Sequence, residues 1–462
     1  MRDWLRLFKD HRQRRRNGTG GRSEVTLPGP RSLVRGTCAV KIRFVRVLAV
    51  RRPQLGGLLR GVGLVALGLF GALAVEASDL SSAHAHTCSV TPEGGVSCWG
   101  LNDHGQLGDG SLFDSLLPTA VTGLGGAAVA VASGSSHSCA LLASGAVACW
   151  GDNTDGQLGT GDLTLARSLT PVPVVGLGGS VATIAAGVAH TCVTLSFGAV
   201  QCWGDNADGQ LGDSSFTDRF APIAVPGLSV PITELALGEG HTCALTMLNA
   251  VLCWGDNSAG QLGDGTTANK PFVNAVPSLS MDVATLGAGV FHSCAVKTTG
   301  EALCWGDNFL GQLGTGDFDD RHVPTLVVGL GGAVDRIDAG EGFTCARLVS
   351  GGLECWGDNL DGQLGDGTTD ERVDPMPVLG LSGAVDVLAL GDSHGCARMV
   401  GGAMECWGDN FYGQLGDGST TTALAPVAVV TATPVPLLPA SRFGLGILLA
   451  CLGGFYSTRR RG

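Results

Sequence analysis

Short apolar runs recur along the chain at a fixed spacing, and glycine, proline or small polar residues bound each of them. In one copy, Val181 and Ile184 lead into small residues, and the runs 192–195 and 200–203 follow on either side of a glycine-bearing turn. A further apolar run comes late in each copy, as in 171–175. Runs this short, rich in valine and separated by turn residues, predict four β-strands per copy, with a hairpin in the middle.

The copies share one motif, His-[Thr/Ser]-Cys followed by a turn and then by Val-x-Cys-Trp-Gly-Asp-Asn-x-x-Gly-Gln-Leu-Gly. Seven tryptophans mark the copies and stand 51 or 53 residues apart: Trp99, Trp150, Trp203, Trp254, Trp305, Trp356 and Trp407. Such a period indicates a repeat architecture in which each unit buries its apolar face against its neighbours. Four strands in each of seven repeats predict an all-β, seven-bladed β-propeller, which leaves only short, protected sheet edges.

The cysteines follow the same repeat. Folding the segment 139–149 about Ser144 sets its two cysteines directly opposite each other on a hairpin, with Cα atoms about 4.5 Å apart, which suits a disulfide. Zinc is the alternative, but one cysteine pair per repeat supplies too few ligands. Seven disulfides indicate an oxidising compartment. We expect disulfides of Cys88 with Cys98, Cys139 with Cys149, Cys192 with Cys202, Cys243 with Cys253, Cys294 with Cys304, Cys345 with Cys355 and Cys396 with Cys406.

Charge is distributed unevenly along the 462 residues, whose formal net charge is −12. Residues 61–441 contain nine Lys and Arg against 38 Asp and Glu, a net charge of −29, whereas residues 1–60 are strongly basic. A surface this acidic repels phosphate backbones, so nucleic acid is excluded as a partner of the repeat region.

The chain before the repeats has the pattern of a targeting segment. Basic residues up to Arg60, the apolar run 61–74 and small residues ending at Ala77 are typical of a secretory signal peptide, which we assign to residues 51–77. Residues 1–50 are interpreted as a basic, disordered extension or as the product of a start site placed too far upstream. The propeller is then expected over residues 78–430.

The chain after the repeats has three parts: a proline-rich linker (431–442), an apolar run (443–456) and the cluster Arg459–Arg461. This order resembles the PEP-CTERM sorting tails of Gram-negative envelope proteins. A helix of 14 residues reaches about 21 Å, short of a bilayer core of about 30 Å, so a processed sorting tail and a short permanent anchor both remain open. Either one predicts an exported protein at the cell envelope or cell surface, with membrane contact through residues 443–462.

The segment Trp-Gly-x-Asn-x-x-Gly-Gln-Leu-Gly, with a Gly-x-x-His-[Thr/Ser] turn upstream, resembles the regulator of chromosome condensation (RCC1) repeat. The resemblance covers about 350 residues and implies a seven-bladed propeller, and the paired cysteines point to a bacterial exported subtype. Nuclear members of the family are guanine-nucleotide exchange factors that bind nucleosomes, and secreted bacterial members include an inhibitor of β-lactamase. The fold therefore transfers to this chain, but an activity does not.

Three sets of repeated polar residues could have a functional role, but for each set we favour a structural role. The Asp-Asn pairs (Asp152-Asn153 to Asp409-Asn410) suggest calcium but lack the order of known calcium loops. The histidines suggest a metal ring, yet Phe343 takes the seventh position, so we expect bonds to a neighbouring backbone. Glutamine is expected to satisfy buried backbone groups. The histidines are His86, His137, His190, His241, His292 and His394, and the glutamines are Gln106, Gln157, Gln210, Gln261, Gln312, Gln363 and Gln414.

Function is expected where the repeats differ, in the loops after Gly-Gln-Leu-Gly. Four of the nine bases of the acidic region fall there, next to aromatic residues, and this combination is typical of interface hot spots. The alternative is a set of variable solvated loops. The candidate binding residues are Arg219, Phe220, Lys270, Phe272, Arg321, His322 and Arg372.

We therefore predict a monomeric, non-enzymatic binding propeller for an extracytoplasmic protein or glycan, with no cofactor and no metal. An exported hydrolase or lyase working in the central funnel is an alternative, but no catalytic triad or metal spacing emerges around the departures His104, His322 and Phe343. Exchange-factor activity is a second alternative by family analogy. Export, acidity and the lack of a long blade insertion all disfavour it.

Overall fold

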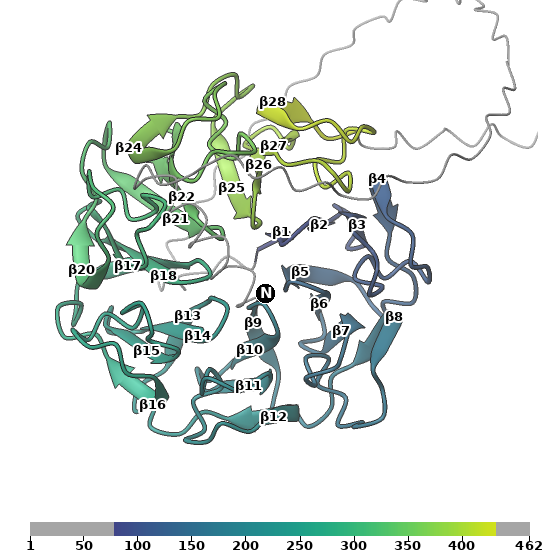
Figure 1. The fold of residues 1–462 in the computed structure, drawn as a ribbon. Helices are drawn as coiled ribbons and strands as arrows, with labels where there is room; N and C mark the ends of the chain where they lie inside the picture. Colours follow the sequence, from purple (N-terminus) through teal and green to yellow (C-terminus); the bar gives the residue numbers. More distant parts are fainter. Residues whose placement is uncertain (1–77, 431–462) are drawn as a thin grey trace, which may run out of the picture. The chain divides into compact units, whose positions relative to one another are not determined.

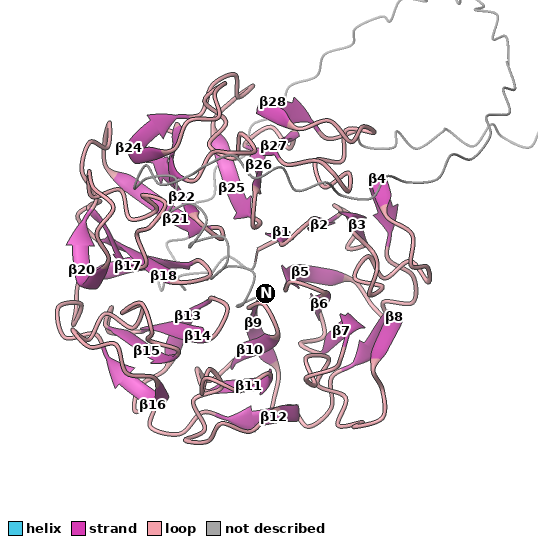
Figure 2. Ribbon diagram, viewed as in Figure 1, coloured by secondary structure: helices cyan, strands magenta, loops and turns pink. Residues whose placement is uncertain are grey.

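Residues 78–430 are described by the structure, a computed structural model, and they form seven four-stranded antiparallel sheets around a central axis (Figure 1). Within this range every regular element is a strand, which confirms the all-β, seven-bladed propeller (Figure 2). A helix long and apolar enough to cross a membrane is not found among these residues. The segments assigned to 1–50, 51–77, 431–442 and 443–462 lie outside the described residues.

Each blade consists of four consecutive strands, and the first strand is nearest the axis (Figure 1). Blade 1 contains β1 (Leu80–Ala83), β2 (His86–Val90), β3 (Val96–Gly100) and β4 (Ser115–Ala120). Blade 2 contains β5 (Ala128–Ser133), β6 (His137–Leu142), β7 (Val147–Asp152) and β8 (Arg167–Pro173). Blade 3 contains β9 (Val181–Ala186), β10 (His190–Leu195), β11 (Val200–Gly204) and β12 (Arg219–Ala224).

The other four blades follow the same order. Blade 4 contains β13 (Ile232–Leu237), β14 (His241–Thr246), β15 (Val251–Gly255) and β16 (Lys270–Ala275). Blade 5 contains β17 (Val283–Ala288), β18 (His292–Lys297), β19 (Ala302–Gly306) and β20 (Arg321–Leu326). Blade 6 contains β21 (Val334–Ala339), β22 (Phe343–Leu348), β23 (Leu353–Gly357) and β24 (Arg372–Pro377). Blade 7 contains β25 (Val385–Leu390), β26 (His394–Met399), β27 (Met404–Gly408) and β28 (Ala423–Ala428).

The outermost strand lies earlier than the apolar pattern predicts. The run 171–175 was expected to be a strand, whereas β8 spans Arg167–Pro173. The apolar residue just after the outermost strand contributes to the packing between blades. Val276, which follows β16, is only 1% exposed and packs between two blades. The late apolar run therefore marks the interface between blades as well as a strand.

All seven expected disulfides are present, each closing the hairpin between the second and third strands of a blade. Cys139 and Cys149, for example, are directly opposite in the β6–β7 register, and their Cα atoms are 4.0 Å apart. Every disulfide closes a loop of similar length and stabilises the folded state by about 3 kcal/mol in the chain-entropy description. The bonds join Cys88 to Cys98, Cys139 to Cys149, Cys192 to Cys202, Cys243 to Cys253, Cys294 to Cys304, Cys345 to Cys355 and Cys396 to Cys406. Cys38 and Cys451 lie outside the described residues.

The hydrophobic core is divided into seven clusters, and each cluster lies between two neighbouring blades. In one of them, Leu141 and Leu158 of blade 2 pack against Val193 and Trp203 of blade 3. The ring closes in the same way, since Leu415 of blade 7 packs with Leu80 and Trp99 of blade 1. No blade buries its apolar face alone, so the blades depend on one another.

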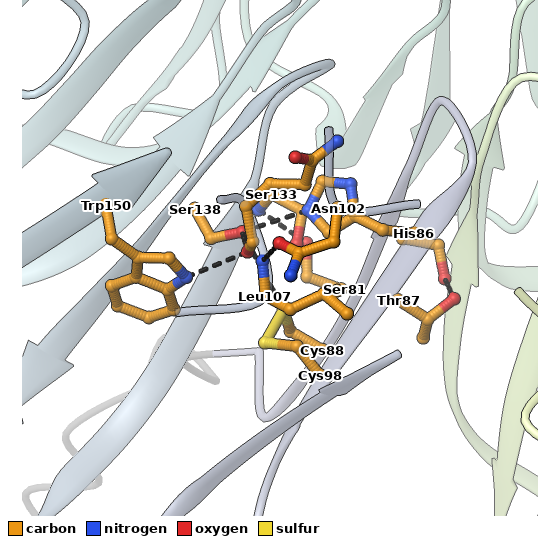
Figure 3. The surroundings of a disulfide bond; sticks show 12 residues. Ser81, His86, Thr87, Cys88, Cys98, Asn102, Leu107, Ser133, Ser138 and Trp150 are labelled. Atoms are coloured by element: carbon orange, nitrogen blue, oxygen red, sulfur yellow. Dashed lines mark hydrogen bonds between the residues drawn. A yellow bond between two sulfur atoms is a disulfide. The ribbon is translucent and has the colours of Figure 1, made fainter. Parts of the chain in front are cut away.

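A hydrogen bond from each tryptophan crosses the interface between blades. The indole Nε1 donates to the backbone carbonyl oxygen of the glutamine in the preceding blade, at 2.8–2.9 Å in all seven interfaces. Figure 3 shows this bond for Trp150. Glycine is required beside the indole ring, because a Cβ atom on Gly212 would lie 2.7 Å from Nε1 of Trp254. The bonds are Trp99–Gln414, Trp150–Gln106, Trp203–Gln157, Trp254–Gln210, Trp305–Gln261, Trp356–Gln312 and Trp407–Gln363.

The six histidines also bind the next blade, but through a side-chain hydroxyl rather than the expected backbone. His241 Nε2 lies 2.9 Å from Ser293 Oγ, which in turn donates to the carbonyl oxygen of Gln261. Because the Ser293 hydroxyl donates its proton to the Gln261 carbonyl oxygen, it can only accept a hydrogen bond from His241. Nε2 of His241 must therefore be protonated and act as the donor. The pairs are His86–Ser138, His137–Thr191, His190–Thr242, His241–Ser293, His292–Thr344 and His394–Thr87.

The replacement of histidine by phenylalanine in blade 6 is accompanied by a second replacement in the next blade. Phe343 of blade 6 is fully buried, and the next blade has Gly395 where the others have threonine or serine. A hydroxyl at that place would face an aromatic ring that cannot donate to it. Phenylalanine and glycine therefore replace the histidine–hydroxyl pair together, as an apolar version of the same contact.

The Asp-Asn-x-x-Gly-Gln segments hold their own loops together. Asn153 Oδ1 accepts the backbone N–H of Leu158, and Gln157 donates to Asp152 while accepting the N–H of Asp155. The same pattern recurs in other blades, for example in the bond from Leu262 N to Asn257 Oδ1. These side-chain oxygens serve the loop, in agreement with the structural interpretation.

Replacing Trp254 by alanine is expected to lower the free energy of unfolding by about 3–5 kcal/mol, because it removes a buried aromatic ring and leaves the Gln210 carbonyl without its indole donor. The measurement is the thermal melting of the ring by circular dichroism. Phe197→Ala is the control, because Phe197 is 64% exposed and should change stability by no more than about 0.5 kcal/mol. Equal melting temperatures for the two variants would contradict the packing role of the tryptophan.

The buried histidines should make the ring sensitive to acid. Burial lowers the pKa of His241 to about 4, so between about pH 6.5 and pH 4 the unfolded chain takes up a proton that the folded ring does not. The contribution of each such histidine to the free energy of unfolding is therefore complete above pH 6.5 and falls as the pH drops, by up to about 1.4 kcal/mol per pH unit.

The variant His241→Phe/Ser293→Gly, which copies the Phe343–Gly395 pair, should show a shallower loss of stability between pH 6.5 and pH 4. Urea unfolding at several pH values measures this slope. His322→Phe, on an exposed strand position, is the control and should keep the parent slope. An unchanged slope in the double variant would show that the buried histidine does not cause the acid sensitivity.

Candidate functional site

The ring has two faces, which we name by the connections that they carry. The loop face holds the short turns from first to second strand and the long loops from third to fourth strand, for example 101–114. The hairpin face holds the turns between the second and third strands and the connections from one blade to the next, for example 121–127. A channel along the axis joins the two faces.

The channel is a cavity of about 750 Å³ lined by the first strands of all seven blades. Most of its lining is small and uncharged, as in β5 (Ala-Val-Ala-Val-Ala-Ser) and β9 (Val-Ala-Thr-Ile-Ala-Ala). Small side chains are needed where seven strands converge, and they leave an open centre. The channel therefore resembles a binding cavity in shape, and most of its polar side chains are serine and threonine hydroxyls.

Four charged residues of the first strands break this pattern, Glu234, Asp335, Arg336 and Asp338, and two of them are held by neighbouring blades. Glu234 accepts a hydrogen bond from Thr285 Oγ1 at 2.8 Å, and Asp338 accepts one from the backbone N–H of Leu390 at 3.1 Å. Burial raises the pKa of both carboxyl groups, that of Asp338 to about 6, while Arg336 opposes the shift in each case. In the other repeats the position of Asp338, opposite a cysteine, holds a small residue such as Ala236.

At the loop face the channel opens through a ring of seven turn residues, which we call the channel mouth. They are His84, Ser135, Val188, Glu239, Val290, Glu341 and Asp392, one from the turn that precedes each histidine or Phe343. The acids and His84 are unevenly placed, because blades 6, 7 and 1 contribute Glu341, Asp392 and His84 in succession. Three of the four charged residues are thus consecutive and form the acidic half of the channel mouth, whereas the other half carries Ser135, Val188, Glu239 and Val290.

The pKa values of two residues at the channel mouth, His84 and Glu341, are raised. His84 Nδ1 lies 2.6 Å from Asp392 Oδ2, and this bond raises the pKa of His84 against the opposing effect of burial. Burial raises the pKa of Glu341 to about 8, with the nearby charges of Asp392 and Asp358 adding to the shift. Near neutral pH, Glu341 is therefore largely uncharged, although three acidic side chains surround the opening.

Next to this acidic half lies an apolar patch formed by five of the six residues that follow Asp-Asn in blades 5, 6 and 7, the sixth being Asp361. Phe411 is 70% exposed, and its ring meets that of Tyr412 edge to face with centroids 4.8 Å apart. Blades 1–4 carry mainly acidic or small residues at the same positions, such as Asp155. The apolar patch consists of Phe309, Leu310, Leu360, Phe411 and Tyr412.

The apolar patch adjoins the channel mouth. A Cβ atom added to Gly342, which follows Glu341, would lie 2.5 Å from Cδ1 of Leu310. Leu360 is half exposed in the next blade. The arrangement offers an exposed aromatic surface beside carboxyl groups, which suits a ligand with both apolar and cationic parts.

The sequence-predicted binding residues lie elsewhere, at the start of the outermost strands of blades 3–6. Each of the four cations forms an ion pair with an aspartate of its own loop, and their side chains are 24–37% exposed. Residue 315 is threonine where the neighbouring blades have aspartate, so Arg321 pairs with an aspartate two positions later. The pairs are Arg219–Asp213, Lys270–Asp264, Arg321–Asp317 and Arg372–Asp366.

The ring-bearing candidates differ in exposure. Phe220 and His322 lie next to Gly156 and Gly260 of the preceding blade, and His322 is exposed, as is Phe272 at 48%. The seven candidates therefore line the outer rim over four blades rather than gathering at one place. His104, also noted in the sequence, lies on the loop face with Nδ1 at 3.5 Å from Asp152 Oδ1.

Sequence reasoning missed the apolar patch and the charged channel residues. Both could have been found by aligning the repeats and asking where a position changes its chemistry, as at Phe411 or Asp338. Across residues 78–430, the side chains of His, Cys, Asp and Glu form no group of three or more that could hold a metal ion.

Comparison with known proteins agrees with this architecture. The model of the RCC1-like domain matches residues 128–455, and that of the regulator of chromosome condensation (RCC1) repeat matches residues 93–141. The ultraviolet-B receptor UVR8 of Arabidopsis thaliana is 33% identical over 304 residues, which cover 65% of this chain and 69% of the receptor. The human E3 ubiquitin-protein ligase HERC2 is 32% identical over 321 residues, covering 66% of this chain but only 6% of the ligase.

Solved structures show the same fold. Human WBSCR16 superimposes with a TM-score of 0.66 at 22% identity, covering 73% of this chain and 94% of that one. Yeast RCC1 (Prp20), crystallised with Kap60, gives a TM-score of 0.66 at 20% identity, covering 81% and 91%. With the repeat, the seven blades and these matches together, the chain belongs to the RCC1-like family of β-propellers.

Proposed function

We propose that this protein is an exported, envelope-tethered propeller that binds a polypeptide ligand without enzymatic activity. Export is supported by seven disulfides whose cysteines are at most 1% exposed, because bonds of this number form in an oxidising compartment. The signal-like segment 51–77 and the tail 443–462 agree with export in sequence. Solved relatives have protein partners, since yeast RCC1 (Prp20) was crystallised bound to Kap60 and the binding of Prp20p to Gsp1p and histones was studied.

The apolar patch beside the acidic half of the channel mouth is the observation that carries the binding proposal. Exposed Phe411 and Leu360 supply apolar contact area. The Asp392 carboxylate lies next to it, and Glu341 adds a second negative charge once the pH rises above its raised pKa of about 8. Aromatic residues near charge are typical of interface hot spots. We infer that the ligand is a segment with apolar side chains flanked by lysine or arginine.

Binding rather than catalysis is supported by the way the channel carboxyl groups are used. Glu234 bonds Thr285, and Asp338 bonds two backbone N–H groups, so both act as connections between or within blades. A hydrolase needs a nucleophile or an acid–base pair aimed at a shared point in the cavity. The pairings in the described part of the channel favour a structural role for these acids.

Replacing Phe411 by serine is expected to weaken ligand binding by at least about 2 kcal/mol, a factor of about 30, because an exposed hot-spot ring is lost. A peptide-display library selected on the immobilised full chain should yield peptides that combine aromatic or aliphatic residues with lysine or arginine. Their affinity for parent and variant is then measured by calorimetry. Affinity should also fall as salt rises, since part of the attraction is between charges.

Leu163→Ser is the matched control, because Leu163 is 74% exposed on the same face but lies in blade 2, away from the apolar patch. A triple variant of Arg219, Arg321 and Arg372 to serine tests the outer rim. If the triple variant abolishes binding while Phe411→Ser keeps it, the outer rim is the binding surface. Selected peptides without cationic residues would contradict the proposed ligand chemistry.

Binding of a cationic peptide should strengthen between pH 7 and pH 9. The pKa of Glu341 is raised to about 8 by burial and by Asp392, Asp358 and Glu239, with His84 opposing, so the carboxyl group gains its negative charge in this range. Glu341→Gln cannot ionise and should bind with nearly the same affinity at both pH values. A parent protein whose affinity is flat from pH 7 to pH 9 would exclude Glu341 from the binding surface.

A further inference from the structure

The hairpin face is nearly free of charge, in contrast to the acidic loop face. Its seven turns and six connections between blades contain only three charged residues, Glu93, Asp282 and Glu301. Lys297 lies 3.2 Å from Asp282 and 4.0 Å from Glu301 and so balances part of that charge. The turns are residues 91–95, 143–146, 196–199, 247–250, 298–301, 349–352 and 400–403, and the connections are 121–127, 174–180, 225–231, 276–282, 327–333 and 378–384.

Three acids near this face, Asp79, Asp335 and Asp386, pair with arginine, whereas Glu354 and Glu405 are buried and accept backbone N–H groups. Arg347 pairs with Asp335 at 2.8 Å, and Arg398 pairs with Asp386 at 2.7 Å and with Asp79. The strong negative charge of residues 61–441 therefore resides mainly in the loop face. An anionic bilayer would repel the loop face, whereas it would exert little charge repulsion on the hairpin face.

Large apolar side chains are exposed on the uncharged face. Six of them, on turns of blades 3, 4, 6 and 7 and on the connection from blade 4 to blade 5, are 56–76% exposed. Apolar exposure without nearby charge marks a surface that interacts with another apolar phase or partner. The residues are Phe197, Met247, Leu248, Met281, Val349 and Val400.

Both ends of the described chain leave the ring at this same face. Asp79, just before β1, accepts a bond from Val90 N at the end of β2, and Val429, just after β28, donates to Met404 O at the start of β27. The apolar run 443–456 and the three terminal arginines follow only 12 residues after Val430. A chain of 12 residues spans at most about 40 Å, so a tail held in a bilayer keeps the hairpin face next to it.

We propose that the hairpin face is a lipid-contacting surface whose exposed apolar turns enter the boundary between headgroups and acyl chains. This inference rests on the tethering in the proposed function and adds an orientation to it. With the hairpin face on the bilayer, the channel mouth and the apolar patch point away from the membrane toward the ligand. Shallow insertion of apolar side chains from an otherwise uncharged surface is the interaction that interfacial membrane proteins use.

The test places a tryptophan on each face of the full chain and reads its contact with lipid. Phe197→Trp lies on the hairpin face, and Phe411→Trp, with similar exposure, is the matched control on the loop face. Each protein is mixed with phosphatidylcholine–phosphatidylglycerol vesicles whose acyl chains are either ordinary or dibrominated, since bromine quenches tryptophan at short range. The parent protein gives the signal of the native tryptophans, seven of which are buried in the ring.

Dibrominated lipid is expected to quench Phe197→Trp by at least about one third of its added fluorescence and to leave Phe411→Trp at the level of the parent. If the full chain floats with vesicles but Phe197→Trp is not quenched more than the control, the tether stands and the orientation is overturned. A chain that does not float with vesicles at all overturns both. A blue shift of Phe197→Trp that grows with protein concentration in the absence of lipid would assign the face to a second copy and overturn the lipid proposal.

Discussion

The contact between a tryptophan and the preceding blade is the interaction on which the rest of the structure depends. The indole N–H of Trp254 donates to the Gln210 carbonyl, its ring fills the apolar space beside Leu211 and its edge is close enough to Gly212 to forbid a side chain there. The same contact joins blade 7 to blade 1 through Trp99 and Gln414. Closure therefore needs no exchanged strand, because the seventh interface repeats the other six.

Because the repeated residues serve the interfaces between blades, function is left to positions where the repeats differ. Tryptophan and, in six blades, histidine recur because the interfaces need the same donors and acceptors, whereas asparagine and glutamine side chains recur because each loop needs them to hold its own fold. The Phe343–Gly395 pair shows how tightly the two sides are coupled, since loss of the histidine is accompanied by loss of the hydroxyl. Apolar Phe411 and acidic Glu341 belong to no such pairing, and they vary from blade to blade.

The two faces of the ring differ in charge. Long loops with many aspartates lie on one face, while glycine-rich, nearly uncharged turns and connections lie on the other. The separation arises from strand order, since every loop from third to fourth strand must emerge on the same side. A repeat whose long loop is acidic therefore yields one acidic face, and any partner or membrane meets two different surfaces.

From the sequence alone, the period, the hairpins and the disulfide pairs could be predicted, because a 51-residue repeat with opposed cysteines such as Cys139 and Cys149 allows few other arrangements. The structural roles of the histidines and of the Asp-Asn pairs followed from the same repetition. The partner of each histidine did not, since His241 and Ser293 are 52 residues apart and meet only across two blades. For the same reason, only the tertiary structure could bring the apolar patch of blades 5–7 beside the acids of the channel mouth. It also paired the outer-rim arginines with aspartates of their own loops, because ion pairs depend on how each loop folds back rather than on local spacing.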